Sequence, residues 1–406
     1  MPRILIISAG PLCRNPRIVK EAETLARAGH DVTVLTVRNH SVTELADLEL
    51  LRDAPYRRLV FDLIARDFFG RTGARLHRFR IWLARAFVRH LGWQSAHALG
   101  PVSKLLALAR AHPADLTIVH TEAAFWVGTR LLRSGRPVAA DFEDWHSEDL
   151  PPENRATRPV HLLLRLEREL LQRCVYTSTT SHALAAALHA RHGGPLPVVI
   201  TNSFPLQPDP RRAPNTPPVF FWFSQTLGEG RGLEFFFAAW ALTRHPSRVV
   251  LLGEVQPAYR EKLLARISPE RRADVSFLPL VSPAGLPTVI ARHDIGLALE
   301  LDHIVNRDLT ITNKILQYLN AGLAVVATST AGQREVLARA PAAGLLVDAH
   351  ETTGFAAALD SLLADPTELA RRQAAARRAA GEIYSWEREA PTLLATVNQA
   401  LAKRSP

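Results

Sequence analysis

The chain has 406 residues, of which 47% are hydrophobic and 22% are charged, as in an ordinary globular protein. At about 150 residues per domain we expect two or three domains, each with its own core, and this excludes a disordered, collagen-like or disulfide-stabilised chain. Cys13 and Cys174 are the only cysteines, so we expect a reduced, cytoplasmic protein. The apolar run 4–7 is too short for the core of a signal peptide, and no run approaches the roughly 18 residues of a membrane span.

The net charge of +10 leaves two interpretations open. A basic chain favours anionic partners such as nucleic acid, a membrane surface or a phosphorylated substrate. However, only five of the 49 basic residues are lysines, and such a preference for arginine is also typical of a compositional bias. Charge alone therefore does not identify a partner.

The first forty residues predict a strand, a turn, a helix and a second strand. Residues 3–8 are an apolar run, and Asn15 with Pro16 marks the start of an amphipathic helix that Gly29 ends. Residues 31–36 form the next strand. This unit is the building block of a doubly wound α/β fold.

The same pattern continues along the chain in two series. The first series of further strands is predicted at 116–120, 138–141, 175–178 and 198–201. Residues 205–218 are rich in proline, show no apolar period, and read as an interdomain linker. The second series of strands is predicted at 219–224, 248–252, 275–278, 294–298, 324–328 and 344–347. We therefore expect two α/β domains with a ligand at the carboxyl ends of their strands.

Three loops are candidate ligand sites. The turn 10–17 lacks G-x-G-x-x-G, which argues against a nicotinamide dinucleotide, and it either faces a phosphate or acidic substrate or is an ordinary turn with solvated arginines. The second loop, 223–234, is glycine-rich and carries Arg231. In the third, Thr310 or Thr312 caps a helix that Gly322 ends, so that backbone amides, hydroxyls and Lys314 converge as a diphosphate site. The alternative for this third loop is a capped helix with a surface lysine.

Several stretches together resemble the group-1 glycosyl transferases, the family-4 retaining enzymes of the GT-B fold. These stretches are LIISAGPLCRNPRIVKEAETLARAGHDVTVLT, GEGRGLE, HDIGLALE, NKILQYLNAGLAVVAT and SWEREA. They occur in the family's order and cover nearly the whole chain. The resemblance implies an α/β fold with two Rossmann-like domains facing across a cleft, over 1–204 and 219–384, with residues 385–406 crossing back onto the first.

The resemblance also implies a nucleoside-diphosphate sugar held mainly by the second domain and an acceptor bound mainly by the first. Arg231 matches the cation of the family's Lys-Gly pair, and residues 310–314 match its phosphate-binding loop. Gln317 replaces the second glutamate of the E-x7-E motif and keeps hydrogen bonding without the charge. Glu300 and Asp308 are both candidates for the first glutamate. Gln225 stands where the family has a further arginine.

The candidate residues fall into three groups. The catalytic candidates are His120, Arg231, Glu300 and Lys314. The donor-binding candidates are Gly10, Thr226, Gly230, Arg231, Leu278, Asp308, Thr310, Thr312, Asn313, Lys314 and Gln317. The acceptor-side candidates are Arg14, Arg17, Glu122, Glu143 and Asp144, with His146 a weaker one. A strand-end histidine such as His120 is more often structural, but the family has a functional histidine near this place.

Glycosyl transfer builds negative charge on the departing diphosphate, which cations and helix-end dipoles stabilise. We therefore expect a reaction without metal or other cofactor. No D-x-D run lies at a strand tip, and the segment around Asp144 matches a first-domain segment of the family. The resemblance implies retention of configuration, with the leaving phosphate helping to deprotonate the acceptor.

Residues 52–89 contain ten arginines and three aspartates. One helical face carries an apolar set, the opposite face carries arginines, and Trp82 lies at the border; the apolar set is Leu76, Phe79, Leu83, Phe87 and His90, and the arginines are Arg78, Arg85 and Arg89. This pattern suits anionic lipid headgroups, or a helix that packs its apolar face on the first domain and exposes its arginines. The second interpretation is the one we favour from sequence.

We expect a glycosyltransferase whose partners are a nucleotide sugar and a glycan or lipid-linked acceptor, as in cell-envelope polysaccharide assembly. It would be cytoplasmic, with peripheral contact at the inner face of an anionic membrane as an open alternative. The competing functions are a nucleotide-sugar epimerase on the same fold and a catalytically degenerate binding protein. The basic segment has no nucleic-acid motif, so no nucleic-acid partner is expected.

Overall fold

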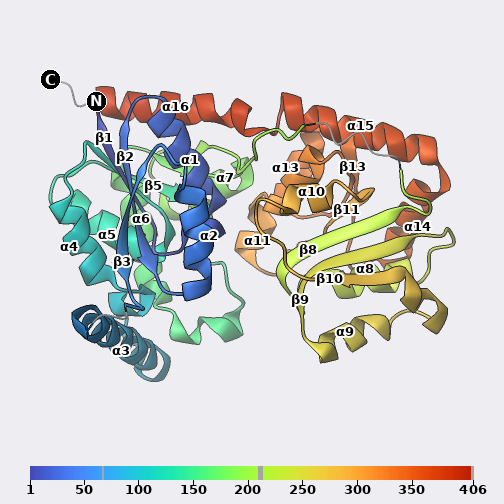
Figure 1. Cartoon of the computed structure of the whole chain (residues 1–406), viewed down its shortest axis with the longest axis horizontal. Helices are drawn as coiled ribbons and strands as arrows, with labels where there is room; N and C mark the ends of the chain where they lie inside the picture. The colour runs from blue at the N-terminus through green and yellow to red at the C-terminus, as the bar shows by residue number, and fades with distance from the viewer. Residues whose placement is uncertain (66–67, 209–213, 404–406) are drawn as a thin grey trace. The chain divides into compact units, whose positions relative to one another are not determined.

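The computed structural model describes residues 1–65, 68–208 and 214–403, and within them the chain forms two compact units. The N-terminal unit comprises Met1–Ile200 and the residues from Ala390 onward, and the C-terminal unit comprises Thr201–Glu389. Each unit is built around one parallel sheet (Figure 1). The expected α/β class with two Rossmann-like domains is confirmed.

The sheet of the N-terminal unit has the order β3-β2-β1-β4-β5-β6-β7. Its strands are β1 (Arg3–Ile7), β2 (Asp31–Arg38), β3 (Arg57–Asp62), β4 (Leu116–Val119), β5 (Val138–Phe142), β6 (Thr177–Thr179) and β7 (Val198–Val199). The helices between them are α1 (Pro16–Arg27), α2 (Ser41–Leu51), α3 (Phe68–Leu91), α4 (Val102–Ala111), α5 (Thr121–Arg133), α6 (Val160–Arg173) and α7 (His182–His192). The chain first adds strands on one side of β1 and then on the other, so the direction switches between β1 and β4.

Helix α1 begins and ends close to the residues that the sequence indicates. Pro16 is its first residue, and Gly29, at φ +94°, follows the helix in a conformation that favours glycine. Asn15 is the N-cap by position, but its side-chain amide donates to the carbonyl of Pro11 at 2.6 Å rather than accepting from the helix. The cap residue therefore stabilises the preceding turn.

The basic segment 52–89 differs from the expectation in two ways, and its residues 66–67 lie outside the described ones. It contains strand β3, which the sequence did not predict. The side of helix α3 that faces the core of the unit also differs from the expected one. The residues on its inner side are Ala74, His77, Ile81, Ala84 and Val88, whereas Leu76 and Phe79 are exposed. Of the apolar set expected to pack on the domain, Leu83 and Phe87 are half-buried, but Leu76, Phe79 and His90 are exposed, so the expected packing is wrong for these three residues.

The sheet of the C-terminal unit has the order β10-β9-β8-β11-β12-β13, with the direction switching between β8 and β11. Its strands are β8 (Val219–Leu227), β9 (Arg248–Val255), β10 (Val275–Leu278), β11 (Ile295–Ala298), β12 (Ala324–Thr328) and β13 (Gly344–Val347). Helices α8 (Leu233–Trp240), α9 (Pro257–Leu264) and α14 (Thr352–Ala364) cover one face. Helices α10 (Leu286–Ile290), α12 (Asn313–Asn320), α13 (Ala331–Arg339) and α15 (Pro366–Glu382) cover the other.

Successive side chains of β8 alternate between the two faces of the sheet and so contribute to the apolar core on each face. Phe220 and Trp222 point into the α8 side and Phe221 points into the α12 side, as the two-residue period of a strand requires. On β11, a Cβ at Gly296 would lie 2.2 Å from the ring of Tyr318. Only glycine allows α12 to approach the sheet this closely, which places the N-terminus of α12 at the carboxyl edge.

The expected linker 205–218 belongs to the C-terminal unit, and its residues 209–213 lie outside the described ones. Phe204 pairs with Ser385 in an isolated parallel bridge. Helix α16 (Trp386–Ala402) starts in the C-terminal unit, and its residues from Ala390 onward belong to the N-terminal unit. Among the described residues, no helix combines the length and apolar character needed to span a membrane.

Candidate functional site

In the N-terminal unit, polar residues gather where β1 and β4 end side by side. The backbone N–H of His120, which follows β4, donates to the carbonyl of Ile7 at the end of β1. Thr121 has φ +69°, the left-handed region that β-branched residues avoid, and its hydroxyl accepts from the N–H of Ala9 at 3.2 Å. Because switch points of doubly wound sheets bind ligands, this edge is the site expected for the unit.

His120 is buried between two carboxylates. Its Nε2 forms a 2.7 Å hydrogen bond with Oε2 of Glu21, and its Nδ1 lies 3.7 Å from Oδ1 of Asp141. Burial lowers the pKa of the imidazole, but the charge and hydrogen bond of Glu21 and the charge of Asp141 outweigh it, so the pKa lies above its ordinary value. The two carboxylates therefore stabilise the protonated form of the ring relative to the neutral form.

Arg17 is buried rather than solvated. Its guanidinium donates two hydrogen bonds to the carboxylate of Asp141, at 2.8 and 2.6 Å, and one to the carbonyl of Ile200 at 2.6 Å. Burial raises the pKa of Asp141, but Arg17 and His120 more than offset this and lower it. The interpretation of Arg17 as an ordinary solvated arginine is wrong, because its buried guanidinium pairs with Asp141, the carboxylate that also lies beside His120.

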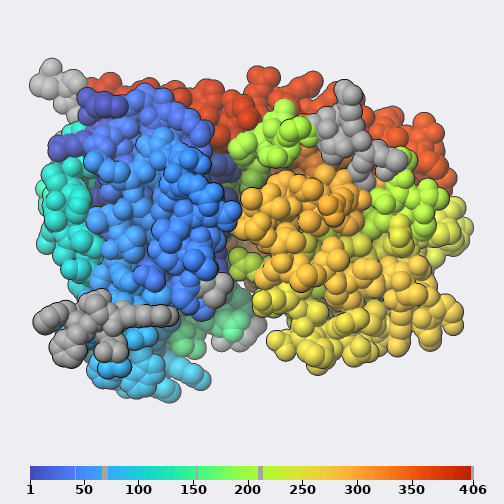
Figure 2. All heavy atoms as spheres, viewed as in Figure 1, coloured from blue at the N-terminus to red at the C-terminus, as the bar shows by residue number. Residues whose placement is uncertain are grey.

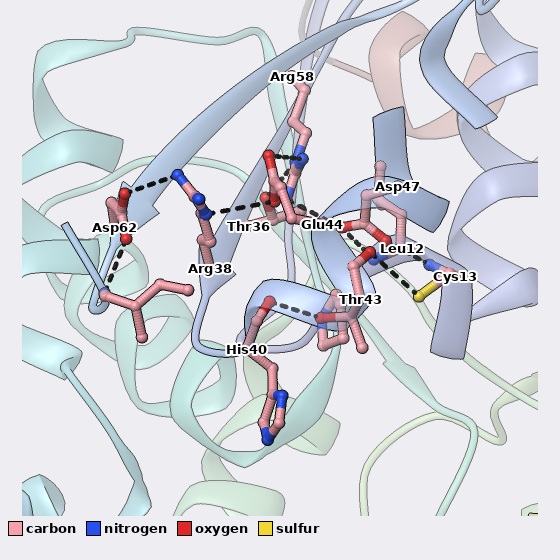
Figure 3. A network of polar contacts seen from close by, with 12 residues as sticks. Leu12, Cys13, Thr36, Arg38, His40, Thr43, Glu44, Asp47, Arg58 and Asp62 are labelled. Atoms are coloured by element: carbon pink, nitrogen blue, oxygen red, sulfur yellow. Dashed lines mark hydrogen bonds and ion pairs between the residues drawn. The ribbon is translucent and has the colours of Figure 1, made fainter. Parts of the chain in front are cut away.

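Helix α2 contacts the turn that carries Gly10 and Arg14 and fixes its backbone. Asp47 is fully buried and accepts hydrogen bonds from the backbone N–H groups of Leu12, at 3.1 Å, and Cys13, at 2.8 Å. Arg58 pairs with the same carboxylate at 2.8 Å (Figure 3). Arg14 itself is exposed. The backbone of this loop is thus fixed while its arginine side chain reaches solvent.

Three acceptor-side candidates, two after β5 and one in α5, lie in different environments. Glu143 has its pKa raised to about 7 by burial and by the charge of Asp144, whereas the Asp144 side chain itself is exposed. Glu122 forms an ion pair with Arg158.

One cluster near these candidates has a possible set of metal ligands. Glu122, His146 and Asp149 each offer a ligand atom, and these atoms lie within 4.8 Å of one another. Arg158 pairs with Asp149 at 2.5 Å as well as with Glu122. Because a guanidinium already neutralises both carboxylates, this donor set does not fit a metal ion.

In the C-terminal unit, cations converge on Glu300 at the second switch point. Lys314, in the first turn of α12, places its ammonium group 2.6 Å from Oε1 of Glu300 and 5.4 Å from the centre of the Trp222 ring. Burial raises the pKa of Glu300, but Lys314, then Arg307 and Arg231, lower it below the ordinary value. Three cationic side chains therefore act on this one carboxylate.

The glycine-rich loop after β8 reaches the same place. Gly232 has φ +80°, and a Cβ there would lie 2.2 Å from the carbonyl oxygen of Leu299. Arg307 donates to the carbonyl of Gly230 at 3.1 Å. The loop thus rests on the end of β11 directly before Glu300. Thr226 and Gln225 are exposed at the end of β8, and Leu278 is half-buried at the end of β10.

The loop 310–314 contains one buried hydroxyl with no partner. Thr312 is the N-cap of α12, yet its side chain makes no capping bond, and its Oγ1 has no hydrogen-bond partner among the described residues. Thr310 donates to the carbonyl of Asn306 at 2.7 Å, and Asn313 accepts from Asn202 at 2.9 Å. Thr312 and the first-turn amides are therefore the groups left for a ligand.

The structure separates the two candidates for the first glutamate. The carboxylate of Asp308 accepts from the N–H of Ala331 at 2.8 Å and so binds the start of α13, whereas Glu300 binds Lys314. Gln317 lines a cavity of about 670 Å³ in the C-terminal unit together with Asn320 and Phe204, and its Oε1 lacks a partner among the described residues.

Sequence reasoning missed Glu21, Asp47, Trp222 and Arg307. For Glu21 a signal existed, because it lies four residues after Arg17 and adjoins the apolar residues of the same helix, so two charges border the buried face. Asp47 and Trp222 contact residues of the two loops that are distant in sequence, and Arg307 lies between Glu300 and Lys314; no local pattern marks any of the three.

Two family models match the chain in consecutive segments. The model for the glycosyl transferase 4-like domain matches residues 15–203, and the model for glycosyl transferases group 1 matches residues 217–365. The chain is also 34% identical over 128 residues to D-inositol 3-phosphate glycosyltransferase of Rhodococcus opacus (strain B4). That match spans 32% of this chain and 27% of the relative.

Solved structures show the same two-domain architecture. HepE from Anabaena, solved in complex with UDP and glucose, has a TM-score of 0.70 at 18% identity and covers 98% of this chain and 100% of its own. Sucrose-phosphate synthase from Thermosynechococcus elongatus has a TM-score of 0.70 at 16% identity, covering 99% and 100%. At these identities the likeness concerns the fold, which is GT-B. With both halves matched by its models, the chain belongs to the group-1 glycosyl transferases.

Proposed function

We propose that this protein transfers a sugar from a nucleoside-diphosphate sugar to an acceptor, with retention of configuration. The observation that carries the proposal is the convergence of Lys314, Arg231 and Arg307 on Glu300 at the N-terminus of α12. Such a site suits a diphosphate, because backbone amides and fixed cations both attract its charge.

The proposed chemistry follows from where charge develops. As the bond between the sugar and the diphosphate breaks, negative charge grows on the leaving oxygen, and preorganised cations lower the barrier. Glu300 orients the ammonium group of Lys314 before the donor arrives. We expect this to proceed without metal or cofactor, with the leaving phosphate helping to deprotonate the acceptor.

The donor and acceptor classes are part of the proposal. HepE was solved with UDP and glucose, so UDP-sugars are the first hexosyl donors to test. We propose that the N-terminal unit, around His120, binds a glycan or lipid-linked acceptor of the kind used in cell-envelope polysaccharide assembly. The protein would act in the cytoplasm, in peripheral contact with the inner face of the membrane.

The test is turnover of purified protein with a panel of nucleotide sugars and acceptors. We expect a free nucleoside diphosphate and a glycosidic product with the donor's anomeric configuration, unchanged by EDTA. Lys314→Ala and Arg231→Ala should each lower kcat by about tenfold or more. Lys262→Ala is the matched control, because it removes an exposed ion pair with Glu229 in the same unit and should leave kcat unchanged.

Three results would contradict the proposal. Full activity of both variants would remove the diphosphate site. An epimerised nucleotide sugar without a glycosidic product would identify an epimerase, and donor binding without turnover would identify a degenerate binding protein.

A further inference from the structure

Helix α3 turns an apolar stripe away from the core of its own unit. Its inner side carries Ala74, His77, Ile81, Ala84 and Val88, and of these Ala84 and Val88 form a small buried cluster with Ala98. At 100° per residue, Leu76, Phe79 and Leu83 lie opposite that inner side. The helix has 24 residues and lies at the lower margin of the N-terminal unit in the view of Figure 1.

The outward residues are large and aromatic. Phe79 is 56% exposed, Trp82 is 63% exposed, and Trp93, just beyond the helix, is 62% exposed. The rings of Phe79 and Trp82 stack at 5.9 Å. Figure 2 shows the blue α3 segment on the surface of the unit. A cluster of exposed aromatic residues on one helix is costly in water and is typical of an interaction surface.

Arginines flank this stripe, and acidic residues are missing from the surrounding sequence. Residues 68–114 contain no Asp or Glu. Arg75, Arg78, Arg80 and Arg89 are exposed, and none of them forms an ion pair with another residue that the structure describes. Arg75, Arg78 and Arg89 lie on the same flank as Trp82. The uncompensated positive charge specifies an anionic partner.

We propose that α3 and Trp93 form a surface that docks on an anionic lipid bilayer, with Phe79, Trp82 and Trp93 entering the interface and the flanking arginines binding headgroup phosphates. Trp favours the boundary between headgroups and acyl chains, and arginine attracts anionic lipids. Nucleic acid would leave the aromatic stripe unexplained, whereas a bilayer uses both the stripe and the arginines, with Trp82 at their border. The docking gives the proposed transferase its membrane contact, but it does not require catalysis.

The test is co-sedimentation of the full chain with phosphatidylglycerol or phosphatidylcholine vesicles, without nucleotide sugar, at low and high salt. We expect binding to phosphatidylglycerol alone, weakened by salt. The triple change Arg75→Glu, Arg78→Glu and Arg89→Glu should weaken it by about tenfold or more. Arg85 is left in place because it donates to the carbonyl of Ala98.

A matched control separates a local site from overall charge. Changing Arg266, Arg272 and Arg378, three exposed arginines of the C-terminal unit, to glutamate alters the net charge equally and should leave binding within about twofold. Circular dichroism and thermal melting confirm that both triple variants are folded. Equal loss of binding in the two would overturn the proposal in favour of nonspecific charge attraction.

A second measurement tests insertion itself. Lipids brominated on the acyl chain should quench tryptophan fluorescence of the bound wild type, and the double change Trp82→Phe and Trp93→Phe should remove most of that quenching while keeping binding. Quenching that persists would overturn the assignment of the inserted residues. Wild type that stays in the supernatant with phosphatidylglycerol at low salt, or that sediments without vesicles by self-association, would overturn the membrane surface, whereas loss of turnover alone would overturn only the proposed function.

Discussion

Buried charges on helix α1 order the edge of the N-terminal sheet. Arg17 and Glu21 lie one turn apart and reach Asp141 and His120, which come from the ends of different strands. Burying such charges costs desolvation that only good pairing offsets, and removing one partner leaves an uncompensated charge. This network therefore ties the ring of His120 to a fixed position at the switch point.

Glu21→Gln should lower the pKa of His120, because it removes the negative charge that raises it. The pKa of His120 in the folded protein lies above its ordinary value of 6.5, so protonation of the ring stabilises the fold. This stabilisation is fully present below pH 6.5 and is lost as the pH rises through the folded-state pKa. The loss of unfolding free energy in the variant should thus be largest near about pH 6 and shrink at higher pH. NMR titration of the imidazole and denaturant unfolding across pH measure both effects.

Glu23→Gln is the control for that change, since Glu23 pairs with Arg27 on the outer side of the same helix at 3.1 Å. An exposed pair of this kind contributes little to stability. An unaltered His120 pKa in Glu21→Gln would show that the carboxylate does not set the ring's charge.

At the scale of elements, the donor-side loops depend on how closely α12 and the glycine-rich loop approach β11. Gly296 and Gly232 each leave no room for a Cβ, against Tyr318 and Leu299 respectively. The sequence shows both glycines, but their partners lie far along the chain. Helix α3 is a second example. Its apolar period was predicted, but the side predicted to pack on the domain is largely exposed, because periodicity does not reveal which neighbours a helix meets.

Gly296→Ala should lower the unfolding free energy by about 1–3 kcal/mol, because the new methyl group overlaps the ring of Tyr318, which is fully buried. Gly228→Ala is the matched control, since its Cβ would meet no atom within 4 Å. Thermal and denaturant unfolding of the two variants provide the comparison. Equal stability of both would contradict the close packing of α12 on β11.

At the scale of the whole molecule, each unit has its own sheet and its own helices on both faces of that sheet. Helix α16 is shared, since it begins in the C-terminal unit and its residues from Ala390 belong to the N-terminal unit. Ligand binding to one unit can therefore be followed separately from the other.

A nucleoside diphosphate should protect the C-terminal unit from hydrogen exchange, most strongly in the glycine-rich loop and the first turn of α12. Binding to the folded state alone stabilises it by about 2.7 kcal/mol at a hundred times Kd. Hydrogen-exchange mass spectrometry with the panel of nucleoside diphosphates measures this, with Lys314→Ala as the variant expected to lose the effect. Protection confined to peptides of residues 1–200 would place the diphosphate in the other unit.

The sequence by itself determined the two parallel α/β domains, most strand positions, helix α12 and the candidates Lys314, Arg231 and Glu300. The domains, the strands, α12 and the loops that carry Arg231 and Lys314 leave local signals, such as an apolar run, a cap or a glycine-rich turn, whereas Glu300 was a candidate only through the family resemblance. Only the tertiary structure decided that Glu300 rather than Asp308 meets Lys314, that Arg17 is buried against Asp141, that β3 joins the sheet, and that α3 turns its aromatic residues outward. These outcomes depend on contacts between residues far apart in the chain, whose pairing no local pattern encodes.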